Sequence, residues 1–422
     1  MVRGWVWTVL RSAQFFQDGG FHAIAYLISA WVVELLMWSV PFSYGVFLEY
    51  YETHVFQDAP SSLLPLVGSI STGLVYLTSW MILPFLARYP GQKKVLMAVG
   101  VVFCVTAMIG AAFATQPWQL VFTQGAIYAL GGSFLYFPAM TYLFEWFSEK
   151  QGLANGIIFS GTGVGGVAFP IIVEVLLRNY GHRVTLLSLA VAFTVLIIPT
   201  FLYIKPRLPP ATTAPPPMDF VRSSPFWILF VANLAQGLPV FIPTLYLPTF
   251  ASDLGLSATA GSLTVSVLNG ASVPGLIFLG WLSDRFDLRI SMLVSTIGSA
   301  LAVFLLWGLS ASLPLLMVFS FVYGFLGPSW SSLWPRFATA IAGDDPRQSS
   351  IVFTIIYGGR GVGNILSGPV GTALMHRWAL TDKTTFAYGL KGYGPLIILT
   401  GLMLLVTSVG VLYRGFRVPG LH

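Results

Sequence analysis

The sequence predicts an all-α membrane protein with twelve transmembrane helices in two six-helix pseudo-symmetric bundles. Three observations predict this fold. Of the 422 residues, 56% are hydrophobic and only 9% are charged, whereas charged residues approach about a quarter of a soluble globular protein. The apolar residues fall in blocks long enough to cross ~30 Å of hydrocarbon. A proline-rich stretch separates two sets of six such blocks, and a glycine motif occurs in both sets.

Hydropathy predicts six spans in each half of the chain. The first six lie near 23–47, 61–84, 95–114, 118–143, 153–177 and 184–204, and the second six near 226–250, 258–282, 291–309, 313–340, 350–375 and 394–413. Residues 205–223 include six prolines and cannot form a span, which is typical of a short linker. We therefore expect an N-terminal bundle over residues 1–204 and a C-terminal bundle over residues 224–422, each with a short tail.

The basic residues predict which side of the membrane each loop faces. With both termini in the cytoplasm, 15 of the 21 lysines and arginines fall in cytoplasmic segments, 5 fall on the opposite side, and Arg360 lies inside a span. Cytoplasmic loops are enriched in lysine and arginine, so we expect the linker and both tails to be cytoplasmic. Because these residues are scattered between apolar blocks, they do not predict a nucleic-acid surface.

An internal repeat supports the two-bundle prediction. The segment 161–165, GTGVG, recurs as GRGVG at 359–363, 198 residues later. Two parallel repeats with a substrate site at their interface, near the middle of the membrane, are typical of transporters. The second copy differs from the first by one charge, since Arg360 stands where the first copy has Thr162.

Arg360 is the main candidate for substrate binding. An ionised side chain at bilayer depth costs at least ~2.5–3.5 kcal/mol on insertion scales, so it normally faces a cavity or a partner. We expect Arg360 to neutralise an anionic substrate in a central cavity; the alternative is a structural arginine bonded to backbone carbonyls or to a fixed carboxylate. The side chains expected to face the same cavity are Tyr357, Asn364, Asn269, Gln236 and Trp334, although packing alone also explains each of them.

Glu34 is the other charge in the middle of a span. Both helices are expected to start on the cytoplasmic side, and at ~1.5 Å per residue Glu34 and Arg360 reach a similar depth. Acidic side chains inside the membrane serve as proton carriers, so we expect Glu34 to carry a coupling proton; the alternative is a buried ion pair or a hydrogen-bonded structural acid. Arg336, near the cytoplasmic end of its span, is expected to snorkel or to form a salt bridge there.

The sequence shows no sign of catalytic or metal chemistry. It contains no nucleotide-binding loop and no Ser-His-Asp arrangement, and its five histidines and single cysteine, Cys104, are scattered. We therefore expect neither an enzyme nor a protein with a cofactor or a metal site.

The loop after the eighth span carries a motif with a clear resemblance. Residues 280–289, GWLSDRFDLR, match the pattern G-x-L-x-D-R-x-x-x-R through Gly280, Leu282, Asp284, Arg285 and Arg289. This pattern resembles the loop motif of the major facilitator superfamily, where it usually follows the second span. The resemblance implies that Gly280, Asp284, Arg285 and Arg289 take part in conformational change.

Within that superfamily the chain resembles the monocarboxylate-transporter-like family, especially its fungal members. Asp18-Gly19-Gly20-Phe21 fits the start of the family's signature before span one, and six positions fit its signature entering span five: Phe147, Leu153, Ala154, Gly156, Gly161 and Gly165. The resemblance implies a transporter. The lysine that animal members carry in span one aligns with Phe42, and their aspartate and arginine in span eight align with Asn269 and Val273, so those three charges are absent here.

We therefore expect a secondary active transporter that moves a small organic anion or carboxylate-bearing metabolite by alternating access, with a proton as the candidate coupling ion in symport. The alternative is an efflux carrier for a larger, weakly charged secondary metabolite, in line with the absent charges and with Phe42. The expected partners are the small anionic substrate, protons and the lipid bilayer. The plasma membrane is the expected location, and a vacuolar or other organelle membrane is the alternative.

Overall fold

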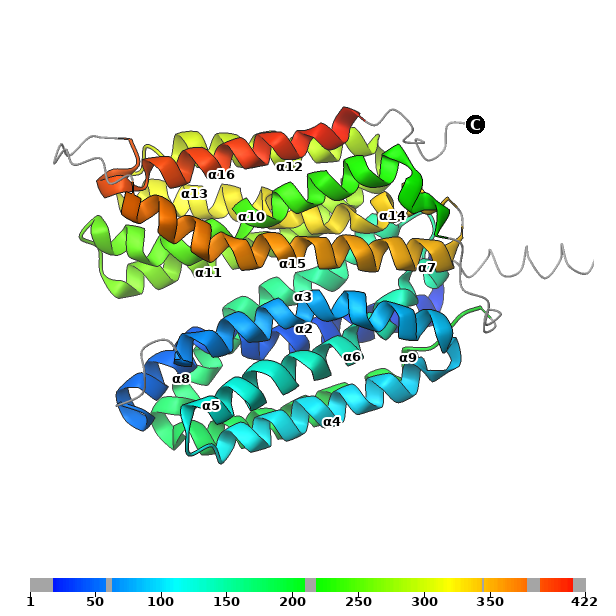
Figure 1. Ribbon diagram of the computed structural model, residues 1–422, viewed down its shortest axis with the longest axis horizontal. Coiled ribbons are helices and arrows are strands. Elements are labelled where there is room, and N and C mark those ends of the chain that lie inside the picture. The colour runs from blue at the N-terminus through cyan, green and yellow to red at the C-terminus, as the bar shows by residue number, and fades with distance from the viewer. Residues whose placement is uncertain (1–17, 58–62, 209–217, 344, 378–387, 413–422) are drawn as a thin grey trace, which may run out of the picture.

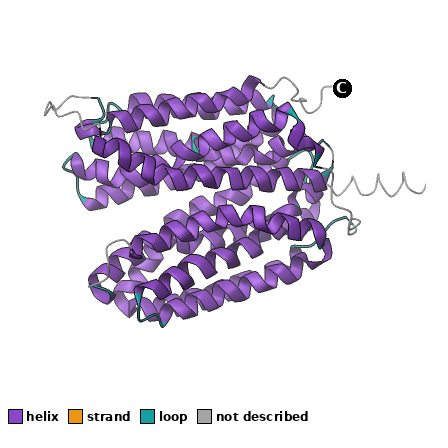
Figure 2. Ribbon diagram, viewed as in Figure 1, coloured by secondary structure: helices purple, strands orange, loops and turns teal. Residues whose placement is uncertain are grey.

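The computed structural model describes residues 18–57, 63–208, 218–343, 345–377 and 388–412. Within these ranges every regular element is a helix, as Figure 2 shows. The part of the proline-rich stretch from 209 to 217 lies outside the described residues. We refer to residues 18–208 as the N-terminal half and to residues 218–412 as the C-terminal half.

The helices of the N-terminal half gather in the lower part of Figure 1. They are α2 (Gly20–Tyr50), α3 (Leu63–Arg88), α4 (Lys93–Ala112), α5 (Pro117–Leu120), α6 (Tyr128–Thr141), α7 (Leu143–Trp146), α8 (Gln151–Ile197) and α9 (Thr200–Tyr203). Three short segments extend or join them: η1 (Tyr51–Val55), η2 (Pro90–Gln92) and η3 (Val121–Ile127).

The helices of the C-terminal half gather in the upper part of Figure 1. They are α10 (Ser224–Asp253), α11 (Ala258–Arg285), α12 (Leu288–Leu301), α13 (Leu313–Leu326), α14 (Trp334–Ala342), α15 (Pro346–Arg377) and α16 (Gly394–Thr407). The shorter segments are η4 (Asp219–Arg222), η5 (Ala302–Trp307), η6 (Pro328–Leu333), η7 (Leu390–Gly392) and η8 (Ser408–Leu412).

Ten segments of the described chain are long and apolar enough to cross a membrane. One of them, Gln151–Tyr203, contains two predicted spans, 153–177 and 184–204. They are divided at Gly181, whose φ of 75° and ψ of 171° are not helical. Glycine adopts a positive φ readily because it has no β-carbon, so the chain can reverse there. The predicted span 350–375 lies within α15, which is not among the ten.

The outer surface fits a lipid environment. Large apolar side chains point away from the protein on several helices; Met81 is 74% exposed and Leu202 is 69% exposed. Extensive apolar exposure of this kind is unusual for a soluble monomer and is typical of a membrane-facing surface. The apolar outer surface of the helices is therefore that of an integral membrane protein.

The two halves meet along two helix pairs, α8 with α11 and α3 with α15. We call the end of the molecule at which α7 passes into α8 and α14 into α15 the linker end, because residues 205–208 lie against α7 there. It is at the right of Figure 1, and the far end is at the left. Hydrogen bonds that join the halves lie towards the linker end, such as Asn155 to the carbonyl of Ser331 at 2.9 Å and Trp80 to the carbonyl of Ile355 at 3.3 Å.

The glycines of segment 161–165 place α8 against helices of both halves. A β-carbon on Gly161 would lie 2.8 Å from the carbonyl oxygen of Trp31 in α2. A β-carbon on Gly163 would lie 2.7 Å from Oγ of Ser272 in α11. Contacts under 3.0 Å essentially never occur for real β-carbons, so glycine permits both close approaches.

The glycines of segment 359–363 place α15 in the same way. A β-carbon on Gly359 would lie 2.7 Å from the ring of Phe230 in α10, within the C-terminal half. A β-carbon on Gly361 would collide with the side chain of Tyr76 in α3, across the interface. The repeated glycines therefore make equivalent contacts in the two halves, one within the half and one to the opposite half.

Candidate functional site

A cavity of about 100 Å³ lies between the two halves in the middle of the molecule. Its lining comes from α2, α3 and α8 on one side and from α10, α11, η6, α14 and α15 on the other. Both mid-span charges, Glu34 and Arg360, line it, together with several aromatic side chains. Cavities that hold drug-sized ligands measure roughly 300–1,000 Å³, so this conformation leaves room for only a small group.

Arg360 is buried, with 5% of its surface exposed. Its Nη1 donates a hydrogen bond of 2.6 Å to Oε1 of Gln236 in α10. Its guanidinium carbon lies 5.4 Å from the ring centre of Phe241 and 5.3 Å from that of Trp334, within the range of cation–π attraction. Among the described residues, no carboxylate lies within ion-pair distance of Arg360. The cation is therefore held by a neutral amide and aromatic faces, without an acid to balance it.

Glu34 is buried on the opposite side of the cavity, with 2% of its surface exposed. The hydroxyl of Thr162 in α8 donates a hydrogen bond of 2.5 Å to Oε1 of Glu34. The other carboxyl oxygen, Oε2, has no hydrogen-bond partner within the described part of the chain. A buried polar atom without a partner needs an explanation, and a proton or a bound molecule would supply one.

Trp334 and Tyr357 form the wall of the cavity towards the linker end. The indole Nε1 of Trp334 donates 2.7 Å to Oδ1 of Asn233, and Nδ2 of Asn233 donates 2.7 Å to the carbonyl oxygen of Ile356. The ring of Tyr357 lies 4.8 Å from that of Tyr76 and 5.5 Å from that of Trp334. The Tyr357 hydroxyl is buried and has no hydrogen-bond partner among the described residues. The wall is thus aromatic, with one polar hydroxyl left for a ligand.

The structure brings most of the predicted site residues together. Arg360, Tyr357, Asn269 and Trp334 line the central cavity. Gln236 lies behind Arg360, and its Nε2 donates 2.9 Å to the carbonyl oxygen of Gly327. Asn364 is half-buried and does not line the cavity in this conformation.

Several residues of the site were not singled out from the sequence for this role. The cavity is also lined by Trp38, Phe42, Tyr76, Phe159, Thr162, Phe241 and Ser272. Trp38 follows Glu34 by four positions, so helical periodicity places both on one face and was a usable signal. Asn233, which orients Trp334, lies three positions before Gln236, so helical periodicity also places these two residues on one face and could have predicted its role. No comparable signal distinguishes Tyr76 or Phe241 in a chain with 15% aromatic residues.

The loop motif after α11 connects the halves at the linker end. The carboxylate of Asp284 accepts backbone N–H bonds from Gly152 at 2.9 Å and Leu153 at 2.7 Å, at the start of α8. Arg336 Nε lies 3.9 Å from Asp284 Oδ1, so Arg336 forms a salt bridge. An acid at a helix N-terminus is favoured by the unpaired N–H groups there.

The remaining motif residues have smaller roles in this conformation. Gly280 packs against the backbone of Gly152 so closely that a β-carbon would not fit. The Arg285 guanidinium lies 5.9 Å from the ring centre of Trp281, and the backbone N–H of Arg289 donates 2.9 Å to Asp287.

Asp18 binds the turn just before the same helix, from within the N-terminal half. Its carboxylate accepts N–H bonds from Ser148 at 3.0 Å and Lys150 at 2.9 Å, and its φ is 62°. Gly20, two positions later, also has a positive φ, of 82°. The acidic-Gly-Gly segment therefore forms a tight turn that ties the start of α2 to the start of α8.

Comparison with known proteins decides the family. The model of the Major Facilitator Superfamily matches residues 12–280 and 229–420 of this chain. The chain belongs to the Major Facilitator Superfamily. The family and the apolar helices make it a multi-pass membrane transporter.

Relatives and a solved structure agree with this family. The chain is 27% identical to the MFS transporter asaE of Aspergillus flavus, over 93% of this chain and 87% of that protein. It is 26% identical to an MFS-type transporter of Gibberella moniliformis, over 85% of each chain. The fold is similar to that of the proton:xylose symporter XylE bound to 6-bromo-6-deoxy-D-glucose, with a TM-score of 0.68 and 12% identity over 92% of this chain and 94% of that chain.

No metal site is evident at the cavity or elsewhere in the described residues, where no three His, Cys, Asp or Glu side chains gather. The groups at the cavity are suited to binding. They comprise one cation without a balancing acid, one carboxyl group with a free oxygen, and aromatic surfaces. This arrangement can hold a small molecule that carries a negative group beside an apolar or ring-shaped body.

Proposed function

We propose that the protein is a secondary active transporter for a small organic anion or carboxylate-bearing metabolite. The observation that supports this most is Arg360, a buried cation that lines the cavity and has no carboxylate partner among the described residues. A buried charge is costly unless it is paired, so the site gains most by binding a negative group.

The guanidinium of Arg360 would hold the substrate's carboxylate. Arginine presents five N–H donors in a planar fork, and one nitrogen is engaged with Gln236. The remaining donors match the geometry of a carboxylate, which binds through two parallel hydrogen bonds. In this proposal Gln236 orients the guanidinium, while Trp334, Tyr357 and Asn269 contact the rest of the substrate. Asn364 does not line the cavity in this conformation, and its contact with the substrate stays a prediction for another conformation.

Glu34 is the proposed coupling residue. It lines the same cavity as Arg360, and one of its carboxyl oxygens is unpartnered within the described chain. A carboxyl group that shares a cavity with the substrate can take up a proton on one side of the membrane and release it on the other. Substrate and proton would then move together, as in symport.

The proposed transport cycle is alternating access between two bundles of six helices, residues 1–204 and 224–422, related by a pseudo-two-fold axis along the membrane normal. The equivalent glycine contacts of α8 and α15 support this symmetry. The hydrogen bonds between the halves at the linker end mark this conformation as closed on that side. We assign the linker end, including residues 205–223, to the cytoplasm. A cysteine placed at Pro215 should then react with a membrane-impermeant thiol reagent only from the cytoplasmic side.

Within the superfamily we assign the chain to the monocarboxylate-transporter-like family. The hydrogen bonds from Ser148 and Lys150, just before α8, to Asp18 give a physical role to the signature residues before α2. We place the protein in the plasma membrane, with no catalytic role of its own.

A second candidate is efflux of a larger, weakly charged metabolite. The aromatic lining favours it, because Trp38, Phe42, Phe159, Phe241 and Trp334 offer a broad apolar surface. Such a substrate would need a cavity larger than the about 100 Å³ of this conformation, and would rely less on Arg360.

Uptake and efflux in reconstituted vesicles separate the two functions. A panel of organic acids and their neutral esters is offered with and without a proton gradient. The proposal expects gradient-dependent accumulation of one or more acids and none of the matching esters. Transport of esters as well as acids, without dependence on the gradient, would favour the second candidate.

A further inference from the structure

The hydroxyl of Tyr136 in α6 is buried near the central cavity and has no hydrogen-bond partner among the described residues. Two neighbouring polar atoms share this property: the hydroxyl of Tyr357 in α15 and Oε2 of Glu34 in α2. Each of the three side chains is 2% exposed or less. A buried polar group without a partner lowers stability, so three of them at one place need a ligand that bonds them.

The three side chains lie close together, although they come from three helices and from both halves. The ring centre of Tyr136 lies 5.3 Å from that of Tyr357. The hydroxyls of Tyr136 and Tyr357 are both close enough to the Glu34 carboxyl group to interact with it electrostatically. Glu34 and Tyr357 line the central cavity, and Tyr136 packs against the ring of Tyr357. A small polar molecule in this part of the cavity can therefore contact both halves.

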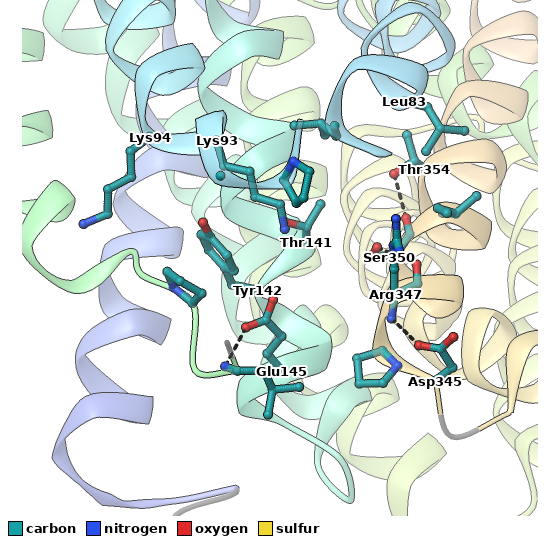
Figure 3. Close-up of a pocket in the computed structure, with 17 residues that line it drawn as sticks. Leu83, Lys93, Lys94, Thr141, Tyr142, Glu145, Asp345, Arg347, Ser350 and Thr354 are labelled. Carbon is teal, nitrogen blue, oxygen red and sulfur yellow. Dashed lines mark hydrogen bonds between the residues drawn. The ribbon is translucent and has the colours of Figure 1, made fainter. Parts of the chain in front are cut away.

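The two tyrosines also separate the central cavity from a larger one. The linker-end cavity measures about 560 Å³ and is lined by α6, α7 and the start of α15, among other segments (Figure 3). Its lining includes Thr141, five positions after Tyr136, and Thr354, three positions before Tyr357. At ~1.5 Å per helical residue, each phenol is less than about 8 Å along its helix from a residue of this lining. The phenols therefore stand where the two halves close the linker end.

The protonation of Glu34 depends on neutral hydrogen-bonding groups around it. Among the described residues, the titratable groups that face it are phenols from α3, α6 and α15, namely Tyr76, Tyr136 and Tyr357, while Arg360 lies across the cavity. The neutral side chains of Thr162 and Trp38 lie beside the carboxyl group. No charged side chain of the described chain forms an ion pair with Glu34.

We propose that Tyr136 is a positioning residue of the proton site: together with Tyr357 it holds a water molecule against the free oxygen of Glu34. A buried water typically makes about three hydrogen bonds to polar groups that are otherwise unsatisfied, and three such atoms are present here. The central cavity of about 100 Å³ has room for it. This inference rests on the coupling role that we propose for Glu34.

The water serves both protonation states of Glu34. When Glu34 is ionised, the phenols donate to the water and the water donates to Oε2. When Glu34 is protonated, its O–H donates to the water, and the water donates to a phenol oxygen, because a hydroxyl both donates and accepts. Since Tyr357 belongs to the C-terminal half, the water keeps all three partners only while the linker end is closed. Proton binding at Glu34 is thereby linked to the conformation of the transporter.

Infrared difference spectroscopy of the purified protein tests this site without a substrate. The pH is changed stepwise in ordinary water and in water enriched in the heavy oxygen isotope. In the wild type we expect a protonated-carboxyl band that Glu34→Gln removes. We also expect an O–H band of water that changes together with the carboxyl band and shifts in the heavy-oxygen water.

Tyr136→Phe removes only the hydroxyl and keeps the ring. We expect it to abolish the water band and to shift the titration midpoint of the Glu34 band by about one pH unit or more, because a hydrogen bond to a charged group changes an equilibrium roughly 10-fold or more. Tyr357→Phe should act in the same way and serves as the second variant if Tyr136→Phe folds poorly.

Tyr128→Phe is the matched control. Tyr128 is an equally buried tyrosine of α6, and its hydroxyl donates 2.9 Å to the carbonyl oxygen of Leu36. The control should lower Tm, because it removes a hydrogen bond to the backbone, but it should leave both infrared bands as in the wild type.

Two results would overturn the inference, and they differ in what they leave standing. If Glu34→Gln removes the carboxyl band while well-folded Tyr136→Phe and Tyr357→Phe keep the wild-type water band and midpoint, the tyrosines have no part in proton binding and Glu34 keeps its proposed role. If the wild type shows no carboxyl band that Glu34→Gln removes, the proposed coupling role of Glu34 fails together with this inference.

Discussion

Two polar pairs, one in each half, each place an ionisable side chain in the lining of the same cavity, and they come from equivalent helices. In the N-terminal half, Thr162 of α8 donates to Glu34 of α2 at 2.5 Å. In the C-terminal half, Arg360 of α15 donates to Gln236 of α10 at 2.6 Å. Thr162 and Arg360 stand at the matching position of GTGVG and GRGVG. Each pair combines one ionisable side chain with one neutral partner.

In the function that we propose, the difference between the pairs gives the two halves distinct roles. The glycines on either side of Thr162 and Arg360 make equivalent helix contacts, so they belong to the scaffold. The residue between them is free to differ, because it points toward the cavity and not into a helix contact. One half then carries an acid with a free oxygen and the other a base without an acid partner among the described residues. We infer that the first serves the proton and the second the substrate.

The largest effect on transport is expected from removing the carboxyl group of Glu34. Glu34→Gln keeps the size and the hydrogen bond to Thr162 but cannot take up a proton. Accumulation driven by a pH gradient should fall to the level without a gradient, while exchange of substrate across the membrane continues. Glu174→Gln is the control, since Glu174 is exposed and pairs with Arg178 on the surface of α8. Unchanged gradient-driven transport in Glu34→Gln would rule out this role.

A smaller effect is expected from placing a carboxylate next to Arg360. Gln236→Glu places a carboxylate at the position that contacts Nη1 of Arg360. It should compete with the substrate's negative group and weaken anion binding roughly 10-fold or more. The measurement is the Kd of the transported anion, determined on purified protein. An unchanged Kd would show that the substrate does not depend on the charge of Arg360.

The shared scaffold can be tested through its glycines. A β-carbon on Gly363 would lie 2.5 Å from the backbone nitrogen of Leu238 in α10, so Gly363→Ala should overpack this contact. Overpacking costs about 1–3 kcal/mol, and we expect a lower Tm with little change in Kd. Gly368→Ala is the control, because no atom lies within 4 Å of the added carbon. Equal Tm values for the two variants would contradict the close packing of α10 and α15.

The smallest effect is expected from the aromatic faces around Arg360. Phe241→Leu removes a ring whose centre lies 5.4 Å from the guanidinium carbon. A cation–π contact of this kind contributes about 1 kcal/mol, so the Kd should rise roughly 5-fold. Phe278→Leu, on the outer surface of α11, is the control. If Phe241→Leu weakened binding as much as the loss of Arg360, the ring and not the charge would dominate recognition.

Much of the fold could be predicted from the sequence, because the membrane imposes simple rules. Apolar runs of about 20 residues are required to cross it, and those runs fall on the observed helices. The limits of α15, Pro346–Arg377, lie within a few residues of the predicted 350–375. The reversal at Gly181 was implied by the break between two predicted spans. The binding of Asp18 to the turn before α8 could not be predicted, because it depends on a contact between residues 130 positions apart.

The candidate site was only partly predictable. Charges inside the membrane are rare, and this rarity pointed to Glu34 and Arg360. Gln236 was expected to face the substrate but lies behind Arg360, because helix rotation decides which face of α10 meets the cavity. Tyr76 reaches the cavity through the close approach of α3 to Gly361. A contact between the two halves of this kind follows from tertiary packing and leaves no pattern in either segment alone.

The most direct test of the account is the affinity of Arg360 variants for the transported anion and for its neutral ester. Arg360→Ala should weaken the anion roughly 10- to 100-fold and leave the ester nearly unchanged. Arg360→Lys keeps the charge but loses the planar fork, so it should fall between the wild type and Arg360→Ala. Both variants should fold, with expression and Tm near the wild type. Well-folded Arg360→Ala protein that binds the anion as tightly as the wild type would contradict the account.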